Sequence, residues 1–469
     1  MSKALKRCVV AALALAFLLG GVARAAFTEE EVLRRRIDKM ERELSDLKRQ
    51  LDRRPAAQGV GRAQVSQIVK EELEKAQGPE TMKVYWDKGL RLKSMDGAFK
   101  LKIGGRVMAD WAWMDADEEI ETALGELEGD AEFRRARFYM SGDIYDNVGY
   151  KLQIDFAGGD ADLKDAYLSF DNLVPIGELK VGNFKEPFSL EELTSSKYIT
   201  FMERALPVEA FSPSRNMGFG VSNTFMEERG TLAAGIFWAH DSNDDEATYQ
   251  EGVNLTGRVS YLPLYEDDGR KLVHLGLGGS YRSSPDMVRY RSRPEVHLAE
   301  NRWVDTGSWL ADEVVLCGLE AAMVHGPFSL QGEYITADTD IEGVSSSDDP
   351  TTDGFYVFAS YFLTGEHRPY KKSAGAFSRV KPNNNFDGRG NWGAWEVAAR
   401  YSNVDLNDEV YEGSGELDNI TLGLNWYLNP NMRIMWNYIH SSLDDADVGE
   451  RLPLDDEADT FMMRFQVDF

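Results

Sequence analysis

Hydrophobic and polar residues alternate along the last nine residues of this 469-residue chain. Phe461, Phe465 and Phe469 share one parity with two further apolar residues, whereas the positions between them are mostly polar. Because side chains alternate between the two faces of a strand, one face of this segment is apolar. A soluble sheet that ended in this way would expose an unpaired, aggregation-prone edge strand. In a closed outer-membrane barrel, that strand is paired and its apolar face contacts lipid. The pattern favours the barrel, and the last strand of a soluble β-sandwich is the alternative.

The same period of two recurs from about residue 83 to the C-terminus. Sixteen runs fit it, at 99–113, 136–144, 148–156, 166–170, 179–181, 217–225, 232–238, 253–261, 273–281, 315–323, 328–334, 355–363, 395–401, 420–428, 432–438 and 461–469. Single-chain bacterial barrels have an even number of antiparallel strands. The sequence therefore predicts an all-β fold, a sixteen-stranded antiparallel transmembrane β-barrel over residues 83–469. We expect the last strand to pair with the strand that begins near Phe99.

The N-terminal residues carry three other patterns. Residues 1–25 combine a basic start, an apolar stretch and a small-residue cleavage site, which is typical of a signal peptide. Residues 26–54 predict an α-helical coiled-coil segment, with a lone amphipathic helix as the alternative. Its heptad seam consists of Leu33, Ile37, Met40, Leu44, Leu47 and Leu51. Residues 55–82 predict a linker with a short amphipathic helix. We therefore expect export to the outer membrane, with an N-terminal periplasmic extension.

Charge and cysteine content exclude several classes of protein. Removing residues 1–25, which hold four basic and no acidic residues, changes the net charge from −27 to −31 and argues against a nucleic-acid partner. Cys317 is the single cysteine left, so no disulfide framework is expected. We find no catalytic constellation, Gly-rich phosphate loop or metal-ligand spacing, and expect neither an enzyme nor a cofactor. Acidic clusters such as residues 115–132 predict solvated loops, with a divalent-cation site as the alternative.

The polar parity of the strands is mildly basic. In the first five strands its basic residues are Lys100, Lys102, Arg106, Arg135, Arg137, Lys151 and Lys180. Arginine presents a planar fork of donors that matches oxyanions, and rings of Arg and Lys favour anions in a pore. Two interpretations stay open. The lumen is selective for anions, or these side chains pair with inward acids such as Asp110 and Asp155.

Residues 189–215 interrupt the alternation. The segment is too long for a turn, and it is too apolar for a solvated loop because it contains residues such as Leu190, Phe201 and Phe211. A long loop with apolar anchors packs against something, and in a pore the candidate place is the lumen. Its candidate constriction residues are Glu192, Lys197, Tyr198, Arg204 and Arg215.

Short motifs, in order from about residue 85 to the C-terminus, resemble those of the phosphate-selective porins O and P. They are Leu101-Lys-Ile-Gly-Gly-Arg106, Phe133-Arg-Arg-Ala136, Asp165-Ala-Tyr-Leu-Ser169, Thr194-Ser-Ser-Lys-Tyr198, Glu203-Arg204, Leu363-Thr-Gly-Glu366, Lys381-Pro382, Gly393-Ala-Trp-Glu396 and Thr421-Leu-Gly-Leu-Asn-Trp-Tyr427. The resemblance implies a sixteen-stranded barrel in the outer membrane that assembles as a homotrimer, with its third loop folded inward.

The resemblance also implies an anion site. Phosphate would lie among Arg106, Arg134 and Arg135, near Asp165. Alternation places Arg134 on the lipid side, so a β-bulge or a strand end is needed there. Glu192 stands in a stretch where the family has a contributing lysine, and this exchange would weaken the local positive field.

Two functional hypotheses follow from the sequence. The first is a passive, water-filled channel for small anions, with phosphate as one candidate. The second is a structural protein that tethers the outer membrane to a periplasmic or cell-wall partner through the coiled coil.

Overall fold

The computed structural model describes residues 82–469, apart from residues 88, 118–119, 122–128, 146, 239–251, 300, 344–348, 409–413 and 447–453. The predicted signal peptide, coiled coil and nearly all of the predicted linker lie outside the described residues. Within these ranges, no helix is long and apolar enough to cross a membrane.

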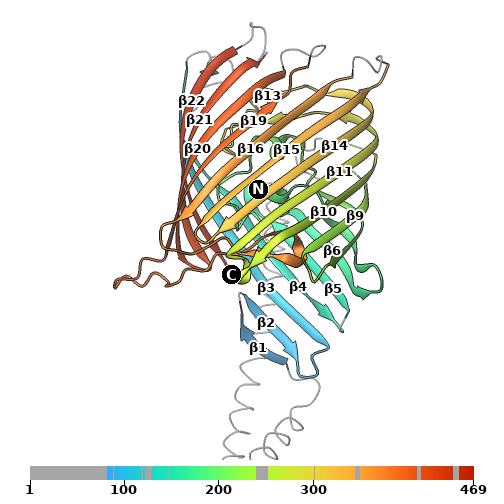
Figure 1. Ribbon diagram of the computed structural model, residues 1–469, viewed down its shortest axis with the longest axis vertical. Coiled ribbons are helices and arrows are strands. Elements are labelled where there is room, and N and C mark those ends of the chain that lie inside the picture. Colours follow the sequence, from blue (N-terminus) through green and yellow to red (C-terminus); the bar gives the residue numbers. More distant parts are fainter. Residues whose placement is uncertain are drawn as a thin grey trace, which may run out of the picture. The chain divides into compact units, whose positions relative to one another are not determined.

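Sixteen antiparallel strands of the described chain close into a barrel (Figure 1). They are β3 (Phe99–Ala116), β4 (Asp130–Ile144), β5 (Val148–Asp155), β6 (Asp162–Leu173), β7 (Gly177–Lys185), β8 (Arg215–Phe225), β9 (Gly230–Trp238), β10 (Val253–Glu266), β11 (Lys271–Val288), β14 (Trp309–His325), β15 (Phe328–Ile341), β16 (Thr351–Phe362), β19 (Ala394–Asp405), β20 (Ser414–Asn429), β21 (Met432–Ala446) and β22 (Leu454–Asp468). Each predicted run falls on one of them, so the sixteen-stranded barrel is confirmed.

The barrel closes where β22 pairs with the upper part of β3, from Asp468 opposite Arg106 to Ala458 opposite Ala116. This is the pairing that the sequence predicted. The lower part of β3 instead pairs with β2 (Leu90–Ser94), which forms a hairpin with β1 (Met82–Trp86). The hairpin continues the sheet below the point where β22 ends (Figure 1). We count no strand here from the sequence, although the alternation begins near residue 83, because the two strands are only five residues long.

The two faces of the barrel wall differ as the alternation predicted. Along β22, Phe461 and Phe465 are exposed on the outside, whereas Arg464 is fully buried on the inside. Exposed large apolar side chains recur on the outward positions of the other strands, as in Leu277 of β11 and Leu319 of β14. An apolar outer band is what a membrane-spanning barrel presents to lipid.

Three segments between strands fold into the lumen. The first, residues 186–214, contains α4 (Leu190–Leu193) and α5 (Leu206–Phe211). The second, residues 289–308, contains β12 (Arg291–Ser292) and β13 (Val304–Asp305). The third lies between β16 and β19, where residues 366–380 contain β17 (Tyr370–Lys371) and β18 (Ala376–Phe377). Residues 381–392, which follow, are largely exposed instead. Sequence reasoning predicted only the first, because the other two lack a long apolar run.

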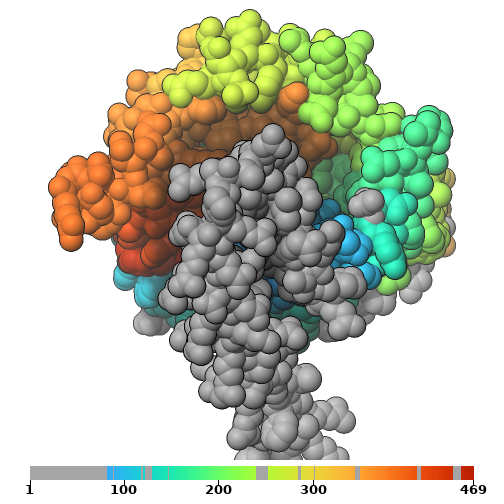
Figure 2. Space-filling model, turned by 90° about the horizontal axis from the view of Figure 1, so that it is seen from below, coloured from blue at the N-terminus to red at the C-terminus, as the bar shows by residue number. Residues whose placement is uncertain are grey.

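The inward segments bury their apolar side chains against one part of the wall. Phe201 and Phe211 of the first segment and Trp303 of the second pack in one cluster with residues of β14, β15, β16 and β19, such as Phe358. Tyr370 of the third segment packs against β10, β11 and β14. Viewed from the lower end, the strands form a ring around a hollow (Figure 2). The packed segments lie beside strands of the β10–β21 part of the wall, and a cavity remains beside β3–β8.

Candidate functional site

A cavity of about 520 Å³ lies in the lumen between β3–β8 and the segment 186–214. Its lining contains ten basic side chains, Arg106, Arg134, Arg135, Arg137, Lys151, Lys164, Lys180, Lys185, Arg204 and Arg215. Two carboxylates, Asp165 and Glu192, share this lining. The cavity is therefore positively charged, although the whole chain carries a net charge of −27.

A β-bulge brings Arg134 into the lumen. The pairing of β3 with β4 shifts between Met108, which faces Arg135, and Ala109, which faces Phe133, so that Arg134 is the extra residue. Its Nε and Nη2 donate hydrogen bonds to Glu203 at 3.0 and 3.1 Å. The bulge that the alternation required is confirmed, and it removes the conflict with the lipid-facing parity.

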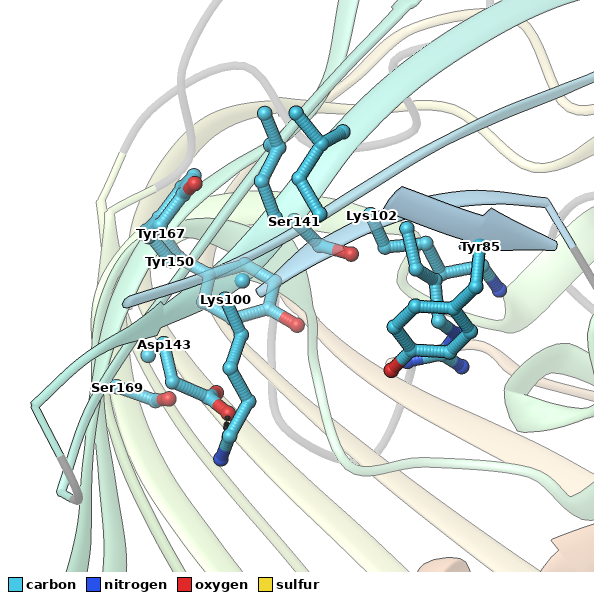
Figure 3. Close-up of a pocket in the computed structure, with 13 residues that line it drawn as sticks. Tyr85, Lys100, Lys102, Ser141, Asp143, Tyr150, Tyr167 and Ser169 are labelled. Atoms are coloured by element: carbon cyan, nitrogen blue, oxygen red, sulfur yellow. Dashed lines mark hydrogen bonds and ion pairs between the residues drawn. The ribbon is translucent and has the colours of Figure 1, made fainter. Parts of the chain in front are cut away.

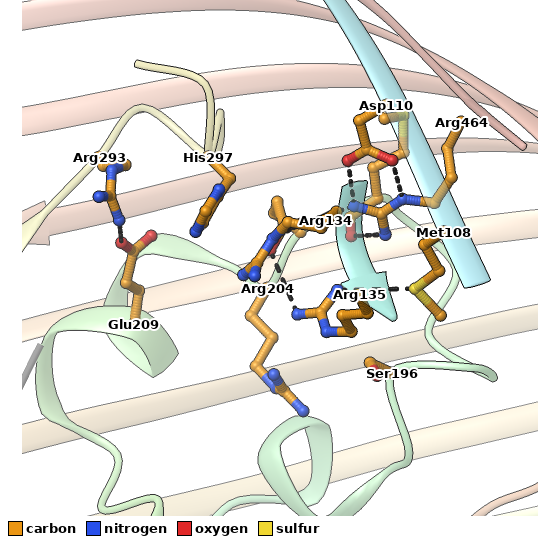
Figure 4. Close-up of polar contacts among 12 residues, drawn as sticks. Met108, Asp110, Arg134, Arg135, Ser196, Arg204, Glu209, Arg293, His297 and Arg464 are labelled. Atoms are coloured by element: carbon orange, nitrogen blue, oxygen red, sulfur yellow. Dashed lines mark hydrogen bonds and ion pairs between the residues drawn. The ribbon is translucent and has the colours of Figure 1, made fainter. Parts of the chain in front are cut away.

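Arg106 and Arg135 are the least neutralised cations of the cavity. Arg106 donates from Nη1 to the Ser196 hydroxyl at 2.6 Å, and no carboxylate of the described residues lies within 4.0 Å of it. Arg135 Nη2 lies 3.7 Å from a Glu203 oxygen, and its buried Nε has no hydrogen-bond partner among the residues that the structure describes. Arg135 lies beside the inward segment that carries Ser196 and Arg204 (Figure 4), and Arg106 contacts the same segment through Ser196. Their guanidinium groups have donors left for an anion.

The other predicted site residues of the wall are paired. Arg137 Nε lies 2.5 Å from Asp155. Lys151 and Arg215 lie on either side of Asp165, at 2.5 and 2.7 Å from its two oxygens. The strands β4–β8 thus hold these cations in fixed positions around the cavity.

Glu192 lies between two further cations. Its oxygens accept from Lys185 Nζ and Arg204 Nε, each at 2.8 Å. Burial by itself would raise the pKa of Glu192, but Arg204 and Lys185 together hold that pKa below its usual value. Glu192 is therefore a carboxylate anion within the cavity.

Four predicted site residues lie outside this cavity. Lys100 and Lys102 line a second cavity of about 330 Å³ at the lower end of the barrel, together with Tyr85 of β1 (Figure 3). Lys197 and Tyr198 lie near Asp468, where Lys197 Nζ is 3.5 Å from the carboxylate. The structure thus divides the predicted residues among three places along the lumen.

Among the basic and imidazole side chains that line the main cavity, sequence reasoning missed three, Lys164, Lys185 and His297. Lys185 has the outward parity of β7 but ends the strand, where alternation no longer decides direction. His297 belongs to the segment 289–308, and its Nδ1 lies 2.8 Å from Glu132. No pattern in the sequence showed that this segment folds inward. The described residues contain no cluster of three or more His, Cys, Asp or Glu side chains that could hold a metal ion.

Arginines on the opposite side of the barrel are neutralised by buried acids. The pairs are Arg258–Glu320, Arg282–Glu186 and Arg400–Glu295. A fourth pair, Arg464–Asp110, lies where β22 closes against β3. Pairing with inward acids was the second interpretation of the basic parity, and it describes these arginines as well as Arg137 and Lys151 beside the cavity. Two other arginines on the opposite side of the barrel, Arg368 and Arg433, donate to the neutral side chains of Gln331 and Gln466.

The comparisons with known proteins agree with this architecture. The family model of the phosphate-selective porins O and P matches residues 101–469. Porin O of Pseudomonas aeruginosa is 29% identical over 420 residues, which cover 81% of this chain and 91% of that protein. An uncharacterized protein of Caulobacter vibrioides is 31% identical over 367 residues, covering 76% of this chain and 71% of the relative.

Among solved structures, an anion-selective porin from Comamonas acidovorans superposes with a TM-score of 0.50 over 78% of this chain and 99% of that chain. The two are 14% identical in sequence, so this likeness concerns the fold. The chain therefore belongs to the family of phosphate-selective porins O and P, and it forms a channel in the outer membrane.

Proposed function

We propose that the protein is a passive, water-filled channel for small anions, that phosphate is one of them, and that it works as a homotrimer. The observation that carries the proposal is the cavity beside β3–β8, where Arg106 and Arg135 keep guanidinium donors without a full carboxylate partner. The names of the relatives support it as well, since one is a porin O and another is described as anion-selective.

The chemistry of the cavity suits transient binding. An oxyanion that loses part of its hydration shell gains charge-assisted hydrogen bonds from arginine, which are stronger than bonds between neutral groups. Because basic side chains follow one another along the cavity, the anion exchanges one set of donors for the next. Conduction needs binding that is favourable on entry and weak enough for release.

The reversal potential of purified protein in a planar lipid bilayer tests the proposal. With a tenfold gradient of potassium chloride across the membrane, we expect the sign of the reversal potential to show a preference for chloride. The physical reason is the excess of basic over acidic side chains around the cavity. A preference for potassium would contradict the anion channel.

A second function, as a periplasmic tether, is motivated by the heptad spacing of residues 26–54. Deleting residues 28–77 separates it from the channel. A tether predicts envelope defects in cells, while the purified variant keeps the single-channel conductance of the full chain. Unaltered envelope integrity in cells that carry the deletion would remove the tether.

A further inference from the structure

Glu192 occupies a position in the cavity that an anion from solution could take. Its two carboxylate oxygens accept from Lys185 and from Arg204, each at 2.8 Å, and its side chain is 7% exposed. A phosphate or chloride ion at this place would meet the same two cations. Each cation has a limited number of N–H donors, so Glu192 and a solute anion compete for the same donors.

The main chain holds the two cations independently of the Glu192 side chain. Lys185 Nζ also donates to the backbone carbonyl of Glu192. Arg204 donates from Nε to the carbonyl of Glu191 at 3.4 Å and from Nη2 to the carbonyl of Glu192 at 3.2 Å. These hydrogen bonds to the main chain should keep both cations in place when the Glu192 carboxylate is neutralised.

The local fold presents Glu192 to these cations. Residues 190–193 form the short helix α4, and the Ser189 side chain caps it by accepting from the backbone N–H of Glu192 at 3.1 Å. The backbone N–H groups of Leu190 and Glu191 donate to Glu333 of β15 at 2.9 and 2.7 Å. The helix is thus fixed to the barrel wall, and its third residue is directed at Lys185 and Arg204.

We propose that Glu192 is a tethered competitor of the permeating anion, which lowers the affinity of the cavity for oxyanions and speeds their release. The inference rests on the proposed anion channel and concerns how tightly that channel holds its solute. A group attached to the site acts at an effective concentration in the millimolar range or above, so a solute anion must displace it at each passage. The expected result is a channel that conducts anions readily and retains them weakly.

Phosphate block of the chloride current tests the inference. The concentration of phosphate that halves the chloride conductance is measured for the full-length protein and for Glu192→Gln. We expect the half-blocking concentration to fall by roughly tenfold in the variant, because a charge-assisted contact pair becomes available to phosphate. The residence time of phosphate on single channels should lengthen in the same variant.

Glu178→Gln is the matched control. It removes the same charge from β7, the strand that precedes the inward segment, but Glu178 contacts Lys180 at 3.1 Å and does not lie between Lys185 and Arg204. An equal fall in half-blocking concentration in Glu178→Gln would show a general effect of net charge and overturn the tethered competitor. Glu192→Asp keeps the charge, and we expect its half-blocking concentration to stay within about threefold of the wild-type value, well short of the change in the neutral variant.

The outcomes also separate this inference from the proposed function. If the wild-type channel shows no anion preference in its reversal potential, the proposed function fails. If that preference is present and Glu192→Gln leaves the half-blocking concentration unchanged, the tethered competitor alone is wrong. Glu192→Ala provides a second neutral variant where Glu192→Gln does not assemble, and it should shift the phosphate block in the same direction.

Discussion

Replacing Arg106 with alanine is expected to lower the affinity of the channel for phosphate by roughly tenfold or more. Removing a hydrogen bond to a charged partner typically costs about 1.5–3 kcal/mol, which corresponds to one or two orders of magnitude in affinity. We expect a large effect at Arg106 because no carboxylate of the described residues neutralises its guanidinium group. Its loss therefore removes N–H donors that can bind the anion. The measurements are phosphate block of the chloride current and the reversal potential, in which the chloride preference should decrease.

The control for this experiment is Arg229→Ala. Arg229 lies in the turn between β8 and β9, so the variant loses the same charge outside the cavity. We expect its phosphate block to match the wild type. Equal phosphate block and equal reversal potential in Arg106→Ala and in the wild type would remove Arg106 from the anion site.

Replacing Arg464 with methionine is expected to destabilise the barrel by about 3–5 kcal/mol, since removing one partner of a buried ion pair leaves an uncompensated charge. Arg464 Nε and Nη2 donate to the two oxygens of Asp110 at 2.7 and 2.5 Å, and Nη2 also donates to Glu203 at 2.6 Å. The side chains of Arg464 and Asp110 are fully buried. This network joins β22 to β3 at the closure of the barrel and anchors the inward segment 186–214 to both (Figure 4).

The midpoint of thermal or urea unfolding in detergent measures this loss. Single-channel conductance gives a second readout, because release of the segment 186–214 from the wall should widen the lumen. Lys271→Met is the control. Lys271 is half-exposed and lies 3.5–3.6 Å from Asp267 and Glu266, and exposed pairs of this kind contribute less than about 1 kcal/mol. A loss of stability in Arg464→Met no greater than that of Lys271→Met would contradict the role of the network.

The barrel and the direction of its side chains could be predicted from the sequence because a strand imposes a period of two over many residues. The parity of β22 separated Phe461 from Arg464 correctly, and the order of the runs identified the strand that closes against it. This reasoning left a bulge or a strand end open at Arg134, since a charged side chain on the lipid face would be costly, and the structure has the bulge.

The candidate site was predicted in part. Arg106, Arg134, Arg135, Arg137, Lys151, Asp165, Glu192, Arg204 and Arg215 lie together around the cavity. Lys100 and Lys102 have the same parity, yet they lie lower in the lumen because β3 is 18 residues long and extends below the cavity. Alternation determines the face of the sheet on which a residue lies. It does not determine which residues of neighbouring strands lie at the same level along the barrel axis.

The alternation of residue types is enough to predict a barrel with an apolar outer face and a mildly basic inner parity. It does not reveal which of the inward basic side chains remain open to an anion, because that depends on the folded chain. Residues 289–308 and 366–380 have no regular period, and they fold inward through contacts with distant strands, such as Trp303 against β14–β19 and Tyr370 against β10–β14. Beside these strands, buried acids neutralise Arg258 and Arg400. Neutralisation depends on distances of a few ångströms between residues far apart in the chain, which a one-dimensional pattern does not contain.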